Sequence, residues 1–147
     1  MSNLLSVEDL SLKDRSTSNN VLRNISFNLK EKEILGVVGE SGSGKTLLSQ
    51  AIVNWLPENL VISSGEINFL GKKMSAMSEN ELEKEIRGKE IAYIGPNAIN
   101  SLDPTYSVGA QLLEKAVSID KGNTSKEILK QKVISLLDDV LIPSPEK

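Results

Sequence analysis

Eight consecutive residues, from Gly39 to Thr46, constrain the possible folds of this chain more than any other feature. They read Gly-Glu-Ser-Gly-Ser-Gly-Lys-Thr and match the pattern G-x-x-x-x-G-K-[ST] at every fixed position. Glycines let the backbone curl so that successive N–H groups point at one anion, which bulkier residues would do only under strain. The lysine supplies positive charge for the outer phosphates of a nucleotide, and the threonine hydroxyl can coordinate Mg²⁺.

The pattern therefore predicts a nucleotide phosphate site, followed by a helix whose positive N-terminal end points at the same phosphates. A chain of this length would carry the pattern by chance roughly once in a few hundred sequences, which disfavours a simple Ser/Gly-rich turn. Glu40 fills a variable position of the pattern, and Thr46 is the predicted metal-binding residue. The predicted binding residues are Gly39, Glu40, Ser41, Gly42, Ser43, Gly44, Lys45 and Thr46.

The segments on either side of the loop have the character that such a site requires. Ile34 to Val38 is short, apolar and β-branched, which predicts a strand buried on both faces of a parallel sheet. After the loop, apolar residues recur at helical spacing until Pro57 ends the run. Trp55 lies on the apolar face of this predicted helix and is expected to be a core or interface residue.

Composition narrows the chemistry that remains possible. The chain has 147 residues with 39% hydrophobic content, which fits one soluble domain with its own core. Its net charge of −3, with acidic and basic residues interleaved, predicts no nucleic-acid partner. The sequence contains no cysteine and no histidine, which excludes zinc sites, thiol chemistry and histidine-based triads but leaves Mg²⁺ on oxygen ligands. No apolar run approaches the roughly 18 residues of a membrane span, so the chain is expected to be cytoplasmic.

Patterns of hydrophobicity predict a β-rich first part and a helical last part. Leu4–Leu12 and Val21–Leu29 alternate, which predicts an antiparallel pair of strands before the loop. Ile134–Asp139 ends in two acidic residues like a catalytic strand, but its apolar residues recur at helical spacing and predict a helix. The other predicted elements are an edge strand over Gly65–Gly71, an exposed helix over Ser78–Arg87, a buried strand over Ile91–Ile94, and helices over Val108–Val117 and Ser125–Val140.

Six segments carry a pattern that extends beyond the phosphate loop: Ile34–Thr46, Gly65–Ile67, Arg87–Ala92, Ser101–Pro104, Val108–Gly109 and Ile142–Lys147. Together they resemble the ATP-binding subunits of ABC transporters, and among these the importers of oligopeptides, dipeptides or nickel. The resemblance runs through almost the whole chain, and the Arg87–Ala92 and Ser101–Pro104 segments separate it from other P-loop proteins. A P-loop GTPase is not supported, because no Asn-Lys-x-Asp motif occurs.

The resemblance implies an α/β fold: a P-loop NTPase core with an antiparallel β subdomain and the start of an α-helical subdomain, truncated after it. Residues 1–95 would form the core, 96–106 a joint loop, and 107–147 the partial helical subdomain. ATP and Mg²⁺ would be the ligands. Membrane-embedded permease subunits and a second ATP-binding subunit would be the partners, on the inner face of the cell membrane.

Three departures from this family affect the expected activity. The metal-reaching glutamine of the joint aligns with Pro96, and Asn97 stands one position away as an open alternative. The aromatic residue that stacks on adenine aligns near Lys13 or Asp14, neither of which has a ring. The signature loop, the catalytic acidic strand and the switch histidine are not present in this sequence.

These departures leave a second hypothesis open, namely a nucleotide-binding module without hydrolysis or a non-functional truncated remnant. No catalytic residue is assigned, and whether the chain is an enzyme stays open. For the strand over Ile34–Val38, the sequence offers Ile91–Ile94 as the only other candidate for the central sheet. We therefore expect an unpaired, apolar sheet edge that is prone to aggregation.

Overall fold

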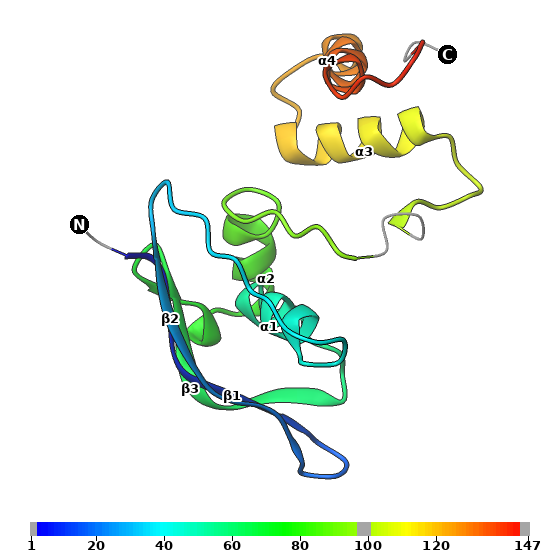
Figure 1. Cartoon of the computed structure of the whole chain (residues 1–147). Helices are drawn as coiled ribbons and strands as arrows, with labels where there is room; N and C mark the ends of the chain where they lie inside the picture. Colours follow the sequence, from blue (N-terminus) through cyan, green and yellow to red (C-terminus); the bar gives the residue numbers. More distant parts are fainter. Residues whose placement is uncertain (1–2, 97–100, 145–147) are drawn as a thin grey trace. The chain divides into compact units, whose positions relative to one another are not determined.

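The computed structural model describes residues 3–96 and 101–144 (Figure 1). The chain divides into two compact units, Met1–Gly95 and Pro96–Lys147. The first unit contains β1 (Asn3–Asp14), β2 (Asn20–Lys30), α1 (Lys45–Ile52), β3 (Leu60–Phe69), β4 (Lys72–Lys73), η1 (Met74–Ala76), α2 (Glu79–Glu81) and η2 (Leu82–Ile86). The second unit contains α3 (Val108–Asp120) and α4 (Lys126–Asp139).

The first unit is built on an antiparallel sheet with the strand order β2-β1-β3-β4. The predicted antiparallel pair is confirmed, with Val7 opposite Phe27 and Lys13 opposite Asn20. The strand predicted from Gly65 begins five residues earlier, at Leu60, and pairs with β1 along most of its length. Its expected place at the edge is taken by the two-residue strand β4.

A line of irregularities crosses three strands of this sheet. Asp9 on β1, Asn24 on β2 and Gly65 on β3 all have positive φ angles, of 45°, 49° and 87°. Side chains replace part of the interrupted ladder, because Asp9 N donates to Ser26 Oγ at 2.8 Å and Asn24 N to Ser11 Oγ at 3.0 Å. Bulges of this kind bend strands and strengthen their twist. The sheet is therefore curved where the three bulges meet.

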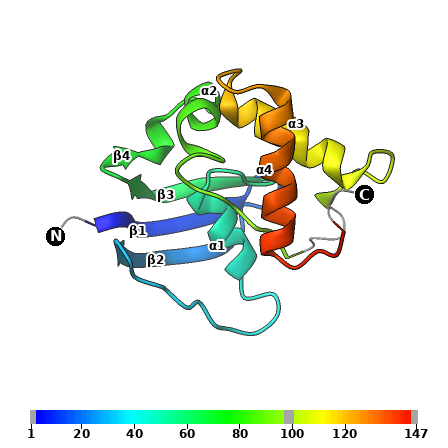
Figure 2. The same ribbon diagram turned by 90° about the horizontal axis from the view of Figure 1, so that it is seen from above.

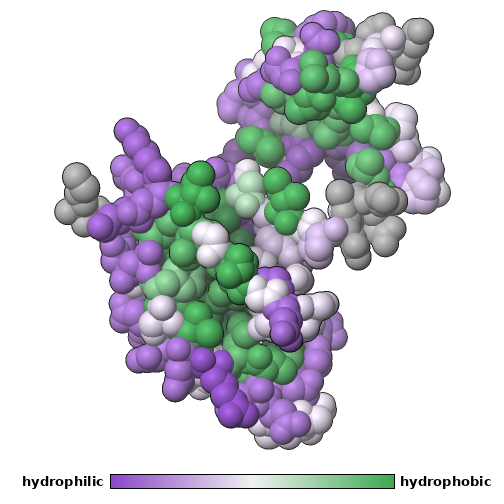
Figure 3. Space-filling model, viewed as in Figure 1, coloured by the Kyte–Doolittle hydropathy of each residue, from purple (hydrophilic) through white to green (hydrophobic). Residues whose placement is uncertain are grey.

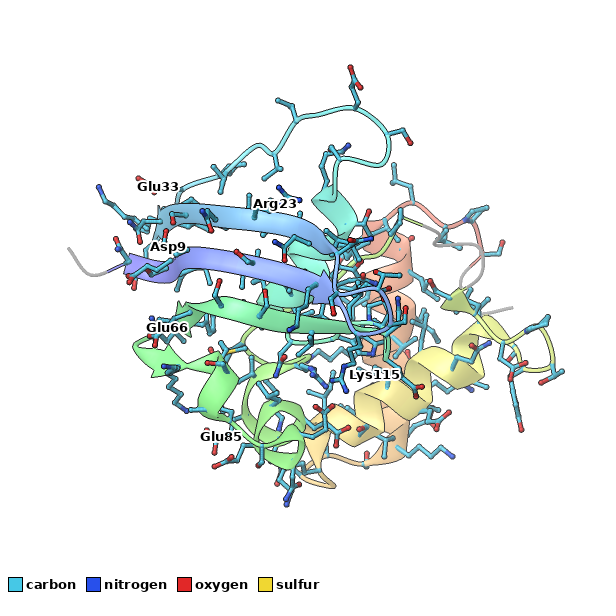
Figure 4. All side chains as sticks on the ribbon, turned by 90° about the horizontal axis from the view of Figure 1, so that it is seen from below. Asp9, Arg23, Glu33, Glu66, Glu85 and Lys115 are labelled. Atoms are coloured by element: carbon cyan, nitrogen blue, oxygen red, sulfur yellow. The ribbon has the colours of Figure 1, made fainter. Side chains whose placement is uncertain are left out.

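The sheet buries one face and leaves the other polar. Charged side chains project from all three long strands, as Figure 4 shows for Asp9 on β1, Arg23 on β2 and Glu66 on β3. The opposite face packs against α1, which lies over it in Figure 2, and against the buried Leu82 and Ile86 of η2. The shared core consists of Leu5, Val7, Leu10, Leu12, Leu22, Leu48, Ala51, Ile67, Phe69, Met74, Leu82 and Ile86.

The helix predicted over Ser78–Arg87 is broken into two turns. Ser78 forms a capping box with Glu81 at the start of α2, and the chain then widens into the π-helical turn η2. The wider turn directs Leu82 and Ile86 into the core, where both are almost fully buried. The prediction of an exposed helix is therefore wrong for its apolar residues, although the acidic residues between them are exposed.

The second unit consists mainly of two capped helices that confirm the predicted pair. Ser107 caps α3 by accepting a hydrogen bond from Ala110 N, and Ser125 caps α4 through Ile128 N. Between them, hydrogen bonds from the Thr124 hydroxyl hold the pKa of the Asp120 carboxyl below its usual range. Residues 134–139 lie within α4, so the helical interpretation of this segment is confirmed.

Two predicted strands of the nucleotide-binding core are wrong as strands in this structure. Residues 33–40 form no regular secondary structure and pair with no described strand, and Ile34 and Val38 are 99% and 93% exposed. Ile91–Ile94 contributes one isolated bridge between Arg87 and Ile91, and Ile94 is 89% exposed. An apolar run forms a buried strand only where other strands and covering layers are available. Figure 3 shows the resulting apolar surface on this unit in green.

Gly65 provides a test of the bulge line. A Cβ at Gly65 would lie 2.4 Å from Glu8 O, whereas a Cβ at Gly71 would meet nothing within 4 Å although φ is positive at both positions. We expect Gly71→Ala to cost about 1 kcal/mol from the φ angle alone. Gly65→Ala should raise amide hydrogen exchange in β1 and β3 at least about tenfold more than Gly71→Ala. Equal exchange in the two variants would contradict the close approach seen at Gly65.

The exposed apolar segments predict self-association of the chain. We expect the purified chain to bind a hydrophobic dye and to scatter light increasingly with concentration, because large exposed apolar patches drive association. The double variant Ile34→Lys/Val38→Lys should reduce both signals, whereas Val140→Lys, in the second unit, should change them little. A monodisperse monomer with a sharp, reversible thermal transition would contradict this prediction.

Candidate functional site

The phosphate-loop pattern lies between the irregular segment 33–38 and the start of α1. Residues 41–44 turn, and helical structure begins at Lys45. No side chain caps this end of α1 among the described residues. The first N–H groups of an α-helix have no acceptor within the helix, and the helix dipole makes this end positive. The start of α1 is therefore suited to an anion.

The side chain of Lys45 folds back into the curve of the loop. Its Nζ donates to Gly39 O at 2.8 Å, to Glu40 O at 2.7 Å and, more weakly, to Ser43 Oγ at 3.3 Å. Ser43 N in turn donates to Glu40 O at 3.2 Å. These bonds close the loop around the ammonium group, so Lys45, Gly39, Glu40 and Ser43 are brought together as one unit.

Gly44 joins this loop to the sheet. Its φ angle is 92°, and a Cβ at this position would lie 2.5 Å from Leu22 Cδ2 on β2. Only glycine combines this backbone conformation with so close an approach. Behind it, Leu48 and Ala51 of α1 are buried in the core. The position of the loop is therefore fixed by its contact with β2 at Gly44 and by the packing of α1 in the core.

The remaining residues of the pattern are accessible. Ser41, Gly42 and Thr46 are exposed, and Glu40 takes part in the loop through its backbone oxygen. Within residues 3–96 and 101–144, no group of three or more acidic residues gathers as a metal site. If Mg²⁺ binds here, Thr46 fits the role of a single hydroxyl ligand, with the other oxygens coming from phosphates and water.

The positions expected to complete the site are only partly described. Pro96 is exposed and offers no side-chain amide, and Asn97 lies outside the described residues. Lys13 and Asp14, the positions near which the adenine-stacking aromatic residue was expected, are the last two residues of β1. The Asp14 carboxylate stabilises the turn that follows β1, where it accepts hydrogen bonds from the Ser16 hydroxyl and the Asn59 amide. These bonds, that from Ser16 most of all, keep the pKa of the Asp14 carboxyl well below its usual range.

The far end of α1 carries a polar contact that the sequence pattern did not indicate. The helix ends at Ile52, so Trp55 lies beyond it and is 60% exposed. Of the two predicted roles, core or interface residue, the core role is therefore wrong and the interface role stays a prediction. Trp55 instead meets Tyr93 edge to face, with ring centroids 5.9 Å apart. The Arg87 guanidinium donates to the carbonyls of Val53 and Asn54 and pairs with Glu79.

Comparison with known proteins gives relatives along almost the whole chain. It is 41% identical over 147 residues to the oligopeptide transport ATP-binding protein OppD of Bacillus subtilis, covering 98% of this chain and 40% of the relative. It is 35% identical over 144 residues to the dipeptide transport ATP-binding protein DppD of Escherichia coli, covering 97% and 43%. The metal-staphylopine import system ATP-binding protein CntD of Staphylococcus aureus is also 35% identical, with 98% and 52% covered.

The chain thus spans about half or less of the length of these relatives. No helix among the described residues is long and apolar enough to cross a membrane. The resemblance to ATP-binding proteins of peptide and metal importers is confirmed by these matches. A family model described as ABC transporter matches residues 22–144, which include the phosphate loop, α1 and both helices of the second unit. This match extends over most of the sequence, and the chain belongs to the ABC transporter family.

Proposed function

We propose that this chain is the nucleotide-binding part of an ABC importer of peptides or metal chelates, and that it binds ATP with Mg²⁺ through Gly39–Thr46. The observation that carries the proposal is the loop closed around Lys45 at the start of α1. The family match and the names of the relatives support ATP as the nucleotide.

The loop has the groups needed to hold phosphate oxygens. The N–H groups at the start of α1 would donate to the inner phosphates, and Lys45 would supply the charge for the outer ones. An ammonium group has three hydrogens, and all three have acceptors within the loop. The contact with Ser43 Oγ is the longest, at 3.3 Å, so we expect a phosphate oxygen to replace it first.

Partners and location follow from the family in the same way. We propose that the complete protein works beside membrane-embedded permease subunits and a second ATP-binding subunit, at the cytoplasmic face of the membrane. The relatives named for oligopeptide, dipeptide and metal-staphylopine transport support an importer. We expect the permease and its binding protein, rather than this chain, to choose the solute.

Replacement of Lys45 tests the binding site. We expect Lys45→Ala to weaken Mg·ATP binding at least about tenfold, a loss of about 1.4 kcal/mol, because it removes the charge directed at the outer phosphates. Lys32→Ala, which removes an exposed charge outside the loop, is the matched control and should bind like the unchanged chain. Isothermal titration calorimetry measures both. Equal affinity in Lys45→Ala and the unchanged chain would show that nucleotide binds elsewhere or not at all.

Hydrolysis by the chain alone is expected to stay at background. Phosphoryl transfer needs a group that positions the attacking water and further charge around the transferred phosphate, which together supply several orders of magnitude in rate. The acceptors bonded to Lys45 Nζ are two backbone carbonyls and one hydroxyl. Among these described contacts there is no carboxylate that could position an attacking water. Phosphate release can be followed with a coupled assay. Steady turnover that Lys45→Ala abolishes would contradict this expectation and favour a self-sufficient enzyme.

A further inference from the structure

We infer that Arg87 is a positioning residue for the phosphate loop: it fixes the far end of α1 and thereby the loop at its start. The inference rests on the proposed function, since it concerns the same nucleotide site. Arg87 follows the π-helical turn η2, where Arg87 N donates to Leu82 O at 2.8 Å. Turns of this kind often occur at functional positions.

The side chain of Arg87 contacts three residues in two separate segments of the first unit. Nε donates to Val53 O at 2.9 Å, Nη2 donates to Asn54 O, and both terminal nitrogens bond the Glu79 carboxylate. Val53 and Asn54 directly follow α1, where the last carbonyls of a helix lack partners and the dipole is negative. The Arg87 side chain is 21% exposed, so most of it is withdrawn from water. Its removal would leave these carbonyls without their charged donor.

The length of α1 makes this contact matter for the loop. The helix has eight residues, which at about 1.5 Å per residue gives a rod of roughly 12 Å. A helix this short is not stable by itself and keeps its position through tertiary contacts. Leu48 is buried near the middle of the helix and Ala51 one residue before its end, and the Leu22 contact of Gly44 holds its start. Arg87 supplies the polar contact at the end of α1. Loss of this contact should therefore displace or fray the helix at whose start the loop lies.

An aromatic contact beside Arg87 gives this inference a direct optical readout. Trp55 is the single tryptophan of the sequence, and it follows Asn54, whose carbonyl Arg87 holds. Its edge-to-face contact with Tyr93 links the end of α1 to the segment that follows Arg87. At 60% exposure, its emission should respond to small changes in this contact. Nucleotide binding at the start of α1 should therefore change the emission of Trp55 at the other end.

The test compares Mg·ATP binding by calorimetry with Trp55 emission in matched variants. We expect Arg87→Ala to weaken binding about tenfold and to lose the emission change at saturation, and Arg87→Lys to recover part of both. Lys89→Ala removes an exposed positive charge two positions away and should bind within about twofold of the unchanged chain. Circular dichroism checks that each variant is folded.

The outcomes separate this inference from the proposed function. If Arg87→Ala does not fold, Arg87→Lys and Glu79→Gln decide, because Glu79 is largely exposed and its amide keeps the shape while removing the charge. Unchanged affinity and emission in both of these variants would overturn the role of Arg87. Binding heat in the unchanged chain without any change in Trp55 emission would overturn it as well, while leaving the ATP site intact. No binding heat in the unchanged chain would overturn the ATP site and, with it, this inference.

Discussion

The packing of α1 against the apolar face of the sheet is the interaction on which the rest of the first unit depends. Leu10 and Leu12 of β1 are fully buried, and Ala51 of α1 is fully buried with them. Each fully buried leucine side chain contributes about 1.5–3 kcal/mol. An isolated eight-residue helix is only marginally stable in water, so this burial fixes both the existence and the direction of α1. The conformation of the phosphate loop follows from that, because the loop is the entry into the helix.

The elements that could be predicted from the sequence are those whose pattern is satisfied by close neighbours. Strands β1 and β2 pair with each other across a short turn. Helices α3 and α4 each begin at a serine cap that can be recognised in the sequence. The phosphate loop was predictable because its glycines and lysine stand at fixed spacing. Its closure by Lys45 onto Gly39 and Glu40 involves only residues of the same motif.

The features that could not be predicted depend on partners distant in the sequence. Ile34–Val38 has the composition of a buried strand, but a strand forms only where a neighbouring strand offers its hydrogen bonds. The bulge at Gly65 results from the approach of Glu8 and Asp9, more than fifty positions away, and no local pattern marks it. Likewise, the spacing of apolar residues extended the first helix to Trp55, whereas the structure ends it at Ile52. The helix ends where Arg87, more than thirty positions later in the sequence, donates hydrogen bonds to the carbonyls of Val53 and Asn54.

The attraction that we propose between this site and an anion would be local. The chain as a whole is negatively charged, at −3, so its overall field does not draw a nucleotide toward the loop. At physiological ionic strength, charges separated by more than about 8 Å are largely screened, which leaves the ammonium of Lys45 and the N–H groups of the first helical turn as the effective donors. These donors act together only while α1 keeps its direction relative to the loop. If the loop binds phosphate as we propose, its affinity would depend on packing as much as on charge, and contacts at both ends of the helix would contribute to it.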